Sequence, residues 1–110
     1  MPSTPELTPT EFCSRWSEEK RDSVTLLDVR EAPEIAIASI PETLKIPMME
    51  IPNRLDELNH DVTVVVMCHS GGRSRRVAEF LLASGFSRVF NLTGGIDAWS
   101  QEINSSIPRY

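Results

Sequence analysis

The chain of 110 residues has only two cysteines, one tyrosine and five glycines, and it contains no long hydrophobic run. No apolar stretch approaches the roughly 18 residues that suggest a membrane span. The first residues lack the basic and then apolar order of a secretory signal. Two cysteines without a C-x-x-C pair predict neither a disulfide framework nor a zinc or iron site. We therefore expect a cytoplasmic protein with no metal, no other cofactor and no membrane partner.

Charge and composition are those of an ordinary soluble domain. Hydrophobic residues make up 40% of the chain and charged residues 25%, and the formal net charge of −5 does not favour nucleic acid. There is no internal repeat, low-complexity tract or linker. The length predicts one domain over residues 1–110, with its core at about residues 7–101 and an irregular tail over 102–110. The oligomeric state stays open.

Short apolar runs alternate with helical segments along the chain. Strands are expected at 24–29, 44–46, 62–67 and 89–92, and helices at 9–23, 33–38, 49–58, 75–83 and 96–101. Strands that are apolar on both faces are typical of a parallel sheet covered on both sides. In such sheets, ligands bind beyond the carboxyl ends of the strands. Cys68 follows one expected strand, and Asp28 lies at the end of another. We therefore expect the site at the carboxyl edge of the sheet.

Cys68 stands at the junction between a buried strand and a helix. The residues that follow it are His69, Ser70, Gly71, Gly72, Arg73 and Ser74. Backbone N–H groups at the start of a helix have no intrahelical partner, and together with the helix dipole they favour negative charge. A nest of such groups can lower the pKa of a cysteine thiol. The pattern predicts a reactive Cys68 and an anion pocket at one place.

Other interpretations of this segment and of the second cysteine stay open. Glycines between a strand and a helix often form only a turn, and the exposed face of a helix commonly carries arginines such as Arg75 and Arg76. His69 is expected at the pocket rim, with a Cys–His dyad as the alternative, because neighbouring side chains on a tight loop point apart. Cys13 is expected to be a packed apolar residue, with a resolving thiol as the alternative.

The chain resembles a single-domain rhodanese, a sulfurtransferase module, from about Leu7 to Trp99. The resemblance rests on four separated motifs: Leu27-Asp28-Val29-Arg30-Glu31, then Ile40-Pro41 with Ile46-Pro47, then Cys68 to Ser74, then Leu92 to Trp99. It implies an open, twisted parallel sheet of about five strands with helices on both faces. One departure is visible, because many members have Gly-His-Ile where this chain has Ala38-Ser39-Ile40.

The resemblance also implies a reaction and a set of site residues. Cys68 would take sulfane sulfur from a small sulfur-containing anion such as thiosulfate, form a persulfide, and pass the sulfur to a thiol, a thioredoxin-like protein or another nucleophile. The N–H groups of residues 69–74 would hold the persulfide, and Arg73 would close the loop. Asp28 and Arg30 would support the site without taking part in the chemistry.

Two alternatives from other functional classes are weighed against sulfur transfer. Phosphatases of similar fold use a C-x5-R loop that surrounds a phosphate, whereas Arg73 follows Cys68 after four residues and Ser74 occupies the C-x5-R position. The shorter loop favours a sulfur atom over a phosphatase or arsenate reductase reaction. A non-catalytic binding or sensing module is also considered, although the cysteine, the glycines and the arginine of the loop are all present.

Overall fold

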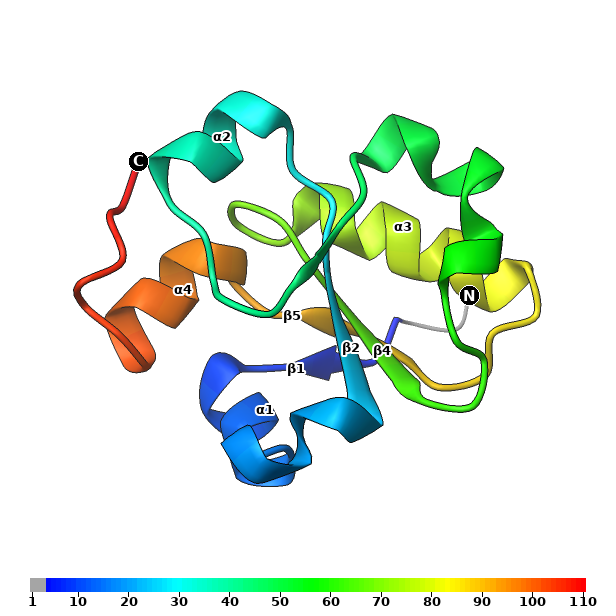
Figure 1. Cartoon of the computed structure of the whole chain (residues 1–110), viewed down its shortest axis with the longest axis horizontal. Helices are drawn as coiled ribbons and strands as arrows, with labels where there is room; N and C mark the ends of the chain where they lie inside the picture. The colour runs from blue at the N-terminus through cyan, green and yellow to red at the C-terminus, as the bar shows by residue number, and fades with distance from the viewer. Residues whose placement is uncertain (1–3) are drawn as a thin grey trace.

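The computed structural model describes residues 4–110 and has a sheet of five parallel strands at its centre (Figure 1). The order of the strands across the sheet is β1-β5-β4-β2-β3. Their bounds are β1 (Glu6–Leu7), β2 (Val24–Asp28), β3 (Leu44–Lys45), β4 (Thr63–Met67) and β5 (Val89–Leu92). The expected open parallel α/β sheet is therefore confirmed.

Helices connect the strands and cover the sheet on both faces. The α-helices are α1 (Pro9–Arg15), α2 (Ala32–Ile37), α3 (Gly72–Ala83) and α4 (Gly95–Glu102), and the 3-10 helices are η1 (Glu18–Ser23), η2 (Met48–Asn53) and η3 (Leu55–Glu57). Figure 1 shows α3 above the strands and α1 below them. Each face encloses its own apolar cluster, one under α3 and η2 and the other under α1 and α4.

The alternation of side chains along β4 explains the two clusters. Successive residues of a strand point to opposite faces, so Val64 and Val66 join the cluster under α3 while Val65 and Met67 join the cluster under α1 and α4. Cys68 keeps the same alternation and joins the α3 side. Its place on that face follows directly from the register of β4.

Several expected elements differ from the structure at their ends. Glu6–Leu7 forms an edge strand beside β5 that the sequence pattern does not reveal, because two residues are too few for a period. The first helix ends at Arg15, and a separate 3-10 helix takes residues 18–23. Helix α3 begins at Gly72, three residues before the expected start, so Arg73 and Ser74 lie in its first turn.

The expected helix over residues 49–58 is wrong. This stretch forms the short 3-10 helices η2 and η3, and Pro52 lies inside the first of them. Proline has no N–H to donate and its ring clashes with the carbonyl four residues before it, so a continuous α-helix through this position is disfavoured. Ile51 and Leu58 still reach the core under α3, whereas Met49 is exposed.

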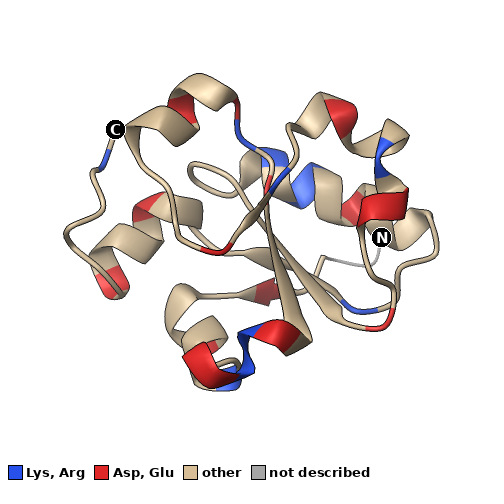
Figure 2. Cartoon of the chain, viewed as in Figure 1, with Lys and Arg blue, Asp and Glu red and all other residues tan. Residues whose placement is uncertain are grey.

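The carboxyl edge of the sheet brings the two expected site segments together. Asp28 and Met67 pair directly across β2 and β4, so the residues that follow each strand emerge side by side. Figure 2 shows basic positions on the part of α3 nearest to α2, which carries acidic positions. The last residues, from Ile103 on, contain no further helix or strand, as expected.

Candidate active site

The Cys68 sulfur lies beneath the loop that joins β4 to α3. The residue is 1% exposed, yet polar donors as well as hydrocarbon surround its sulfur. The Gly71 N–H donates to Sγ at 3.1 Å, and the Ser74 hydroxyl oxygen lies 3.3 Å from Sγ. The side chain is thus turned inward, as a packed cysteine would be, but it meets the N–H groups that the sequence predicts.

Hydrogen bonds decide the ionisation of this thiol. Burial raises the pKa of Cys68, but hydrogen bonds from the Ser74 hydroxyl and from backbone N–H groups outweigh burial, so the pKa is lowered. The contributing N–H groups belong to Ser70, Gly71 and Ser74. Cys13 behaves in the opposite way, because burial raises the pKa of its thiol despite the nearby Arg21. The two thiols therefore differ in the direction that the loop predicts.

Helix α4 fixes the orientation of the loop. The N–H of Ile96 donates to the Cys68 carbonyl at 2.9 Å, and the N–H of Asp97 donates to the His69 carbonyl at 3.1 Å. In a trans peptide the C=O and the following N–H point in opposite directions. Because α4 holds the His69 carbonyl, the N–H of Ser70 is turned toward the sulfur.

Gly95 permits this close approach of α4 to the loop. A Cβ on Gly95 would lie 2.3 Å from the Cys68 carbonyl oxygen and 2.7 Å from that of His69. Its φ of +56° also falls in the left-handed region. Gly95 therefore lies in direct contact with the active-site loop.

Only one of the two loop glycines has a conformational reason to be glycine. Gly71 has a φ of +115°, and its N–H donates to the sulfur. Gly72 begins α3, has no left-handed φ, and has open space where a Cβ would lie. The backbone therefore requires glycine at position 71 and not at position 72.

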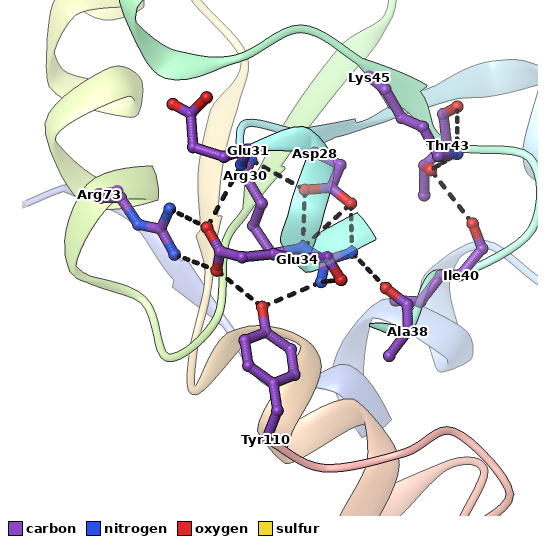
Figure 3. A network of polar contacts seen from close by, with 10 residues as sticks. All are labelled: Asp28, Arg30, Glu31, Glu34, Ala38, Ile40, Thr43, Lys45, Arg73 and Tyr110. Atoms are coloured by element: carbon purple, nitrogen blue, oxygen red, sulfur yellow. Dashed lines mark hydrogen bonds and ion pairs between the residues drawn. The ribbon is translucent and has the colours of Figure 1, made fainter. Parts of the chain in front are cut away.

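Arg73 is tied to α2. Its guanidinium donates to both carboxylate oxygens of Glu34, at 2.6 and 2.7 Å (Figure 3). This bidentate contact lowers the pKa of Glu34 to about 2, against the opposing effect of burial. Arg73 thus fastens the start of α3 to α2, and its charge is matched by that of Glu34.

Tyr110 joins the same network from the end of the tail. Its hydroxyl donates to Glu34 at 2.8 Å and accepts from Arg30 at 3.0 Å (Figure 3). Its ring stacks on the ring of His69, with centroids 4.1 Å apart. His69 is half-buried at the rim, and no hydrogen bond joins it to Cys68 within residues 4–110. The tail therefore covers one side of the loop.

Asp28 and Arg30 form a fully buried ion pair beside the loop. The Arg30 guanidinium lies 2.7 Å from the Asp28 carboxylate, and both side chains are 0% exposed. Arg30 also donates to the carbonyl of Ala38 at 2.9 Å. The pair ties the end of β2 to the end of α2, and the structure places neither side chain against the Cys68 sulfur.

Three residues near the loop were not singled out from the sequence. Asn91 on β5 contacts Ser74 and Gly71, Glu34 holds Arg73, and Tyr110 covers His69. The single tyrosine of the chain was a signal that could have drawn attention to the tail. Asn91 lies in the middle of an apolar strand, where a buried polar residue needs partners, and that pattern was a second available signal.

The structure also shows where Cys13 lies and whether metal-ligand clusters or membrane-spanning helices occur among residues 4–110. Cys13 packs against the cluster under α1 and α4, on the opposite face of the sheet from Cys68, which agrees with a packed residue. Among residues 4–110, no three His, Cys, Asp or Glu side chains converge as metal ligands. Within the same range, no helix has the length and apolar character needed to cross a membrane.

The sheet, the junction loop and the donors around Sγ define a parallel α/β domain whose carboxyl edge holds a cysteine thiol of lowered pKa. A family model described as Rhodanese-like domain matches residues 10–102. The chain therefore belongs to the rhodanese-like domain family, which confirms the expected resemblance.

Relatives and solved structures agree with this family. A protein of Allochromatium vinosum named Sulfurtransferase is 44% identical over 80 residues, which cover 73% of this chain and 75% of that protein. Rhodanese-like/PpiC domain-containing protein 12, chloroplastic, of Arabidopsis thaliana is 42% identical over 93 residues; the match covers 81% of this chain and spans 31% of that longer protein. The crystal structure of a rhodanese-like domain protein from Staphylococcus aureus matches with a TM-score of 0.81 and 32% identity, covering 97% of this chain and 99% of the other.

Proposed function

We propose that this domain transfers sulfane sulfur through a persulfide on Cys68. In the first step, the Cys68 thiolate attacks the outer sulfur of a donor such as thiosulfate, the donor S–S bond breaks, and sulfite leaves with the electron pair. In the second step, an acceptor thiolate attacks the outer sulfur of the persulfide, and the electron pair of the broken S–S bond returns to Sγ. Charge and atoms balance in both steps, and no further oxidant or reductant is needed.

The ring of N–H donors around Sγ is the observation that carries this proposal. Gly71 donates at 3.1 Å, and the N–H groups of Ser70 and Ser74 also lower the pKa of the thiol. Such a nest stabilises the nucleophilic thiolate at neutral pH, where an ordinary cysteine is mostly protonated. The same N–H groups favour the negative charge of a persulfide formed at this position.

The proposal also covers the sulfur donor, the sulfur acceptor and the cellular location of the protein. The nest favours a small anion as sulfur donor, and the acceptor is a thiol, either small or carried by a thioredoxin-like protein. Because Cys68 is 1% exposed, the loop or the covering Tyr110 moves when either substrate arrives. Two free cysteines with no disulfide between them suit the reducing cytoplasm.

Mass measurement on the intact protein tests the proposal. After incubation with thiosulfate and removal of the excess, the wild type is expected to gain the mass of one sulfur atom. Cys68→Ser is expected to gain none, whereas Cys13→Ser, the matched control, is expected to gain one. Cyanide or a thiol should then remove the added sulfur. A wild type that stays unmodified with thiosulfate and with a persulfide donor would show that the proposal is wrong.

An aryl phosphate ester separates this reaction from ester hydrolysis. The loop has four residues between Cys68 and Arg73, and Glu34 already occupies the Arg73 guanidinium. We therefore expect no release of phosphate above the rate of Cys68→Ser. Hydrolysis that depends on Cys68, without sulfur uptake, would instead assign the domain to the phosphatase class.

A further inference from the structure

Asn91 forms a second layer behind the Cys68 site. It lies on β5, is 0% exposed, and its side-chain NH₂ group donates to the Gly71 carbonyl at 3.1 Å. The same nitrogen lies 3.2 Å from both carboxylate oxygens of Glu6 on β1. Because these partners are all acceptors, the orientation of the amide is fixed. Its Oδ1 must then be the atom that faces Ser74.

The Ser74 hydroxyl is consequently shared between two acceptors. Its oxygen is hydrogen-bonded to Asn91 Oδ1 and lies 3.3 Å from Cys68 Sγ. A hydroxyl has one hydrogen to donate, and Asn91 Oδ1 has none. The hydrogen can therefore serve Asn91 or the sulfur at a given moment, but not both. While the thiol is uncharged, the carbonyl oxygen of Asn91 is the stronger acceptor of the two, because neutral sulfur accepts hydrogen bonds only weakly.

We propose that Asn91 is a positioning residue for sulfur transfer, whose Oδ1 holds the Ser74 hydroxyl hydrogen while Cys68 is uncharged and releases it when Sγ gains charge. The inference rests on the proposed function. In the persulfide, the charge lies on the outer sulfur and the hydroxyl stays with Asn91. When the acceptor takes the outer sulfur, the electron pair returns to Sγ and the hydroxyl turns to stabilise it.

The competition between Asn91 and Sγ balances the two half-reactions. A lower thiol pKa makes the thiolate a better leaving group but, at a pH at which the thiol is fully ionised, a weaker nucleophile, with a Brønsted slope of about 0.4–0.5. Without Asn91, the hydroxyl would always be free for Sγ, so discharge of the persulfide would be faster and attack on the donor slower. Each unit of thiol pKa corresponds to about a threefold change in the attack rate of the thiolate.

The other charged groups near this pair keep their ion-pair partners in every variant considered, although Asn91→Ala removes the hydrogen bonds from Asn91 to Glu6. Those that face the loop or the pair are Arg73 with Glu34, Glu6 with Arg75, and Asp97 with Arg109 beside His69. None of them is removed by a substitution at Ser74 or Asn91. The titration of Cys68 can therefore be compared between variants in which the neighbouring ion pairs are unchanged, and the double variant separates the effect of the hydroxyl from that of the contacts with Glu6 and Gly71.

A double-mutant cycle tests the inference in a Cys13→Ser background, where the ultraviolet absorbance of the thiolate reports on Cys68 alone. Ser74→Ala is expected to raise the pKa of Cys68, and Asn91→Ala to lower it. The double variant is expected to match Ser74→Ala, because Asn91 acts only through the hydroxyl. Rates of sulfur loading and discharge, measured separately at a pH at which the titration shows Cys68 to be fully ionised, should shift in opposite directions in Asn91→Ala.

A purely structural role of Asn91 predicts the opposite sign. Loss of its contact with Gly71 would loosen the N–H ring and raise the pKa of Cys68, with the same effect whether or not Ser74 is present. A rise in the pKa of Cys68 in Asn91→Ala would overturn the inference, and so would an equal change with and without Ser74. Should Asn91→Ala fail to fold, Asn91→Leu fills a similar volume and also lacks the acceptor for the hydroxyl. Its fall in the pKa of Cys68 should vanish in the Ser74→Ala background, and an equal fall in both backgrounds would also overturn the inference.

The titration and the sulfur measurements separate this inference from the proposed function. The titration uses no donor, so it reports on the pair whether or not sulfur is transferred. The expected titrations without sulfur uptake would contradict the proposed function alone. Normal uptake and discharge with no coupling between Ser74 and Asn91 would contradict the inference alone.

Discussion

Adjacent residues of the same type have different tasks in the active-site loop. Gly71 adopts a φ of +115°, which side chains rarely adopt, and it brings an N–H to the sulfur. Gly72 is the first residue of α3 and has open space where a Cβ would lie. The sequence presents the two as an equivalent pair. Their different backbone angles, which depend on the surrounding fold, assign the conformational requirement to one of them.

Substitution by alanine should separate the two glycines. Gly71→Ala is expected to cost about 1–3 kcal/mol of stability, because alanine is strained at this φ, and to slow sulfur uptake as the N–H shifts from Sγ. Gly72→Ala, the matched control, is expected to be neutral or to stabilise the protein by about 0.4–1 kcal/mol. Urea unfolding and the thiosulfate reaction measure both effects. Equal costs at the two positions would contradict this assignment.

At the scale of elements, Glu34 on α2 joins three separate parts of the chain. It accepts two hydrogen bonds from Arg73 on α3 and one from Tyr110 in the tail. These partners are 39 and 76 residues away. The contact between α2, α3 and the tail therefore depends on one carboxylate staying ionised.

The stability provided by Glu34 should be lost in acid. Its pKa falls from about 4.3 in an unfolded chain to about 2 in the fold, mainly through Arg73. The stabilisation is therefore complete above about pH 4.3 and disappears as the pH falls toward 2. Glu34→Gln should be less stable than the wild type at neutral pH, by about 1 kcal/mol for a partly exposed pair. The stabilities of wild type and Glu34→Gln should therefore converge as the pH falls from about 4.3 to about 2.

Thermal unfolding at a series of pH values checks the expected convergence. Glu19→Gln on the exposed 3-10 helix η1 is the control, since it removes a carboxylate away from the site. When Glu19→Gln is introduced into both proteins, the difference in thermal stability between wild type and Glu34→Gln should be unchanged. A constant difference between wild type and Glu34→Gln down to pH 2 would show that the ionised carboxylate is not what holds Arg73.

How much of this arrangement could be predicted depends on the distance along the chain over which each signal acts. The β4–α3 junction is local, because an apolar run, a cysteine and a glycine pair follow one another. The capping box at the start of α1 is local too, because Thr8 and Glu11 are only three residues apart. Edge strand β1 has only two residues, and it is defined by its partner β5.

Long-range contacts account for the site features that the sequence did not reveal. The pairing of Arg73 with Glu34 and the stacking of Tyr110 on His69 join segments that no local pattern connects. The sequence predicts a charge at Arg73, and only the fold decides that Glu34 meets it. For the same reason, the sequence pointed to Ser74 but not to Asn91, which lies behind it on the next strand.

At the scale of the whole molecule, the Asp28–Arg30 pair joins the sheet to the segments beyond its edge. Both side chains are 0% exposed, and Arg30 also reaches the Ala38 carbonyl and the Tyr110 hydroxyl. A buried ion pair adds little over a well-packed apolar pair, but loss of one partner leaves an uncompensated charge. The pair is therefore a point at which a single change should affect the entire fold.

Asp28→Ala should lower the free energy of unfolding by about 3–5 kcal/mol, because it leaves the Arg30 guanidinium buried without its carboxylate. This is a large fraction of the stability of a small domain. Circular dichroism and tryptophan fluorescence during urea unfolding should shift together. Asp56→Ala, at an exposed position of η3, is the control and should change little. A cost below about 1 kcal/mol at Asp28 would contradict the prediction.

The hydrogen bonds from Ile96 and Asp97 to the carbonyls of Cys68 and His69 have a consequence for the newly synthesised chain. A ribosome releases the nucleophile well before it releases the segment that orients the peptide groups around it. Until residues 95–97 have emerged and docked, Cys68 is an ordinary thiol with ordinary chemistry. The lowered pKa of Cys68 is therefore acquired only on completion of the domain, and a nascent or prematurely terminated chain would lack it.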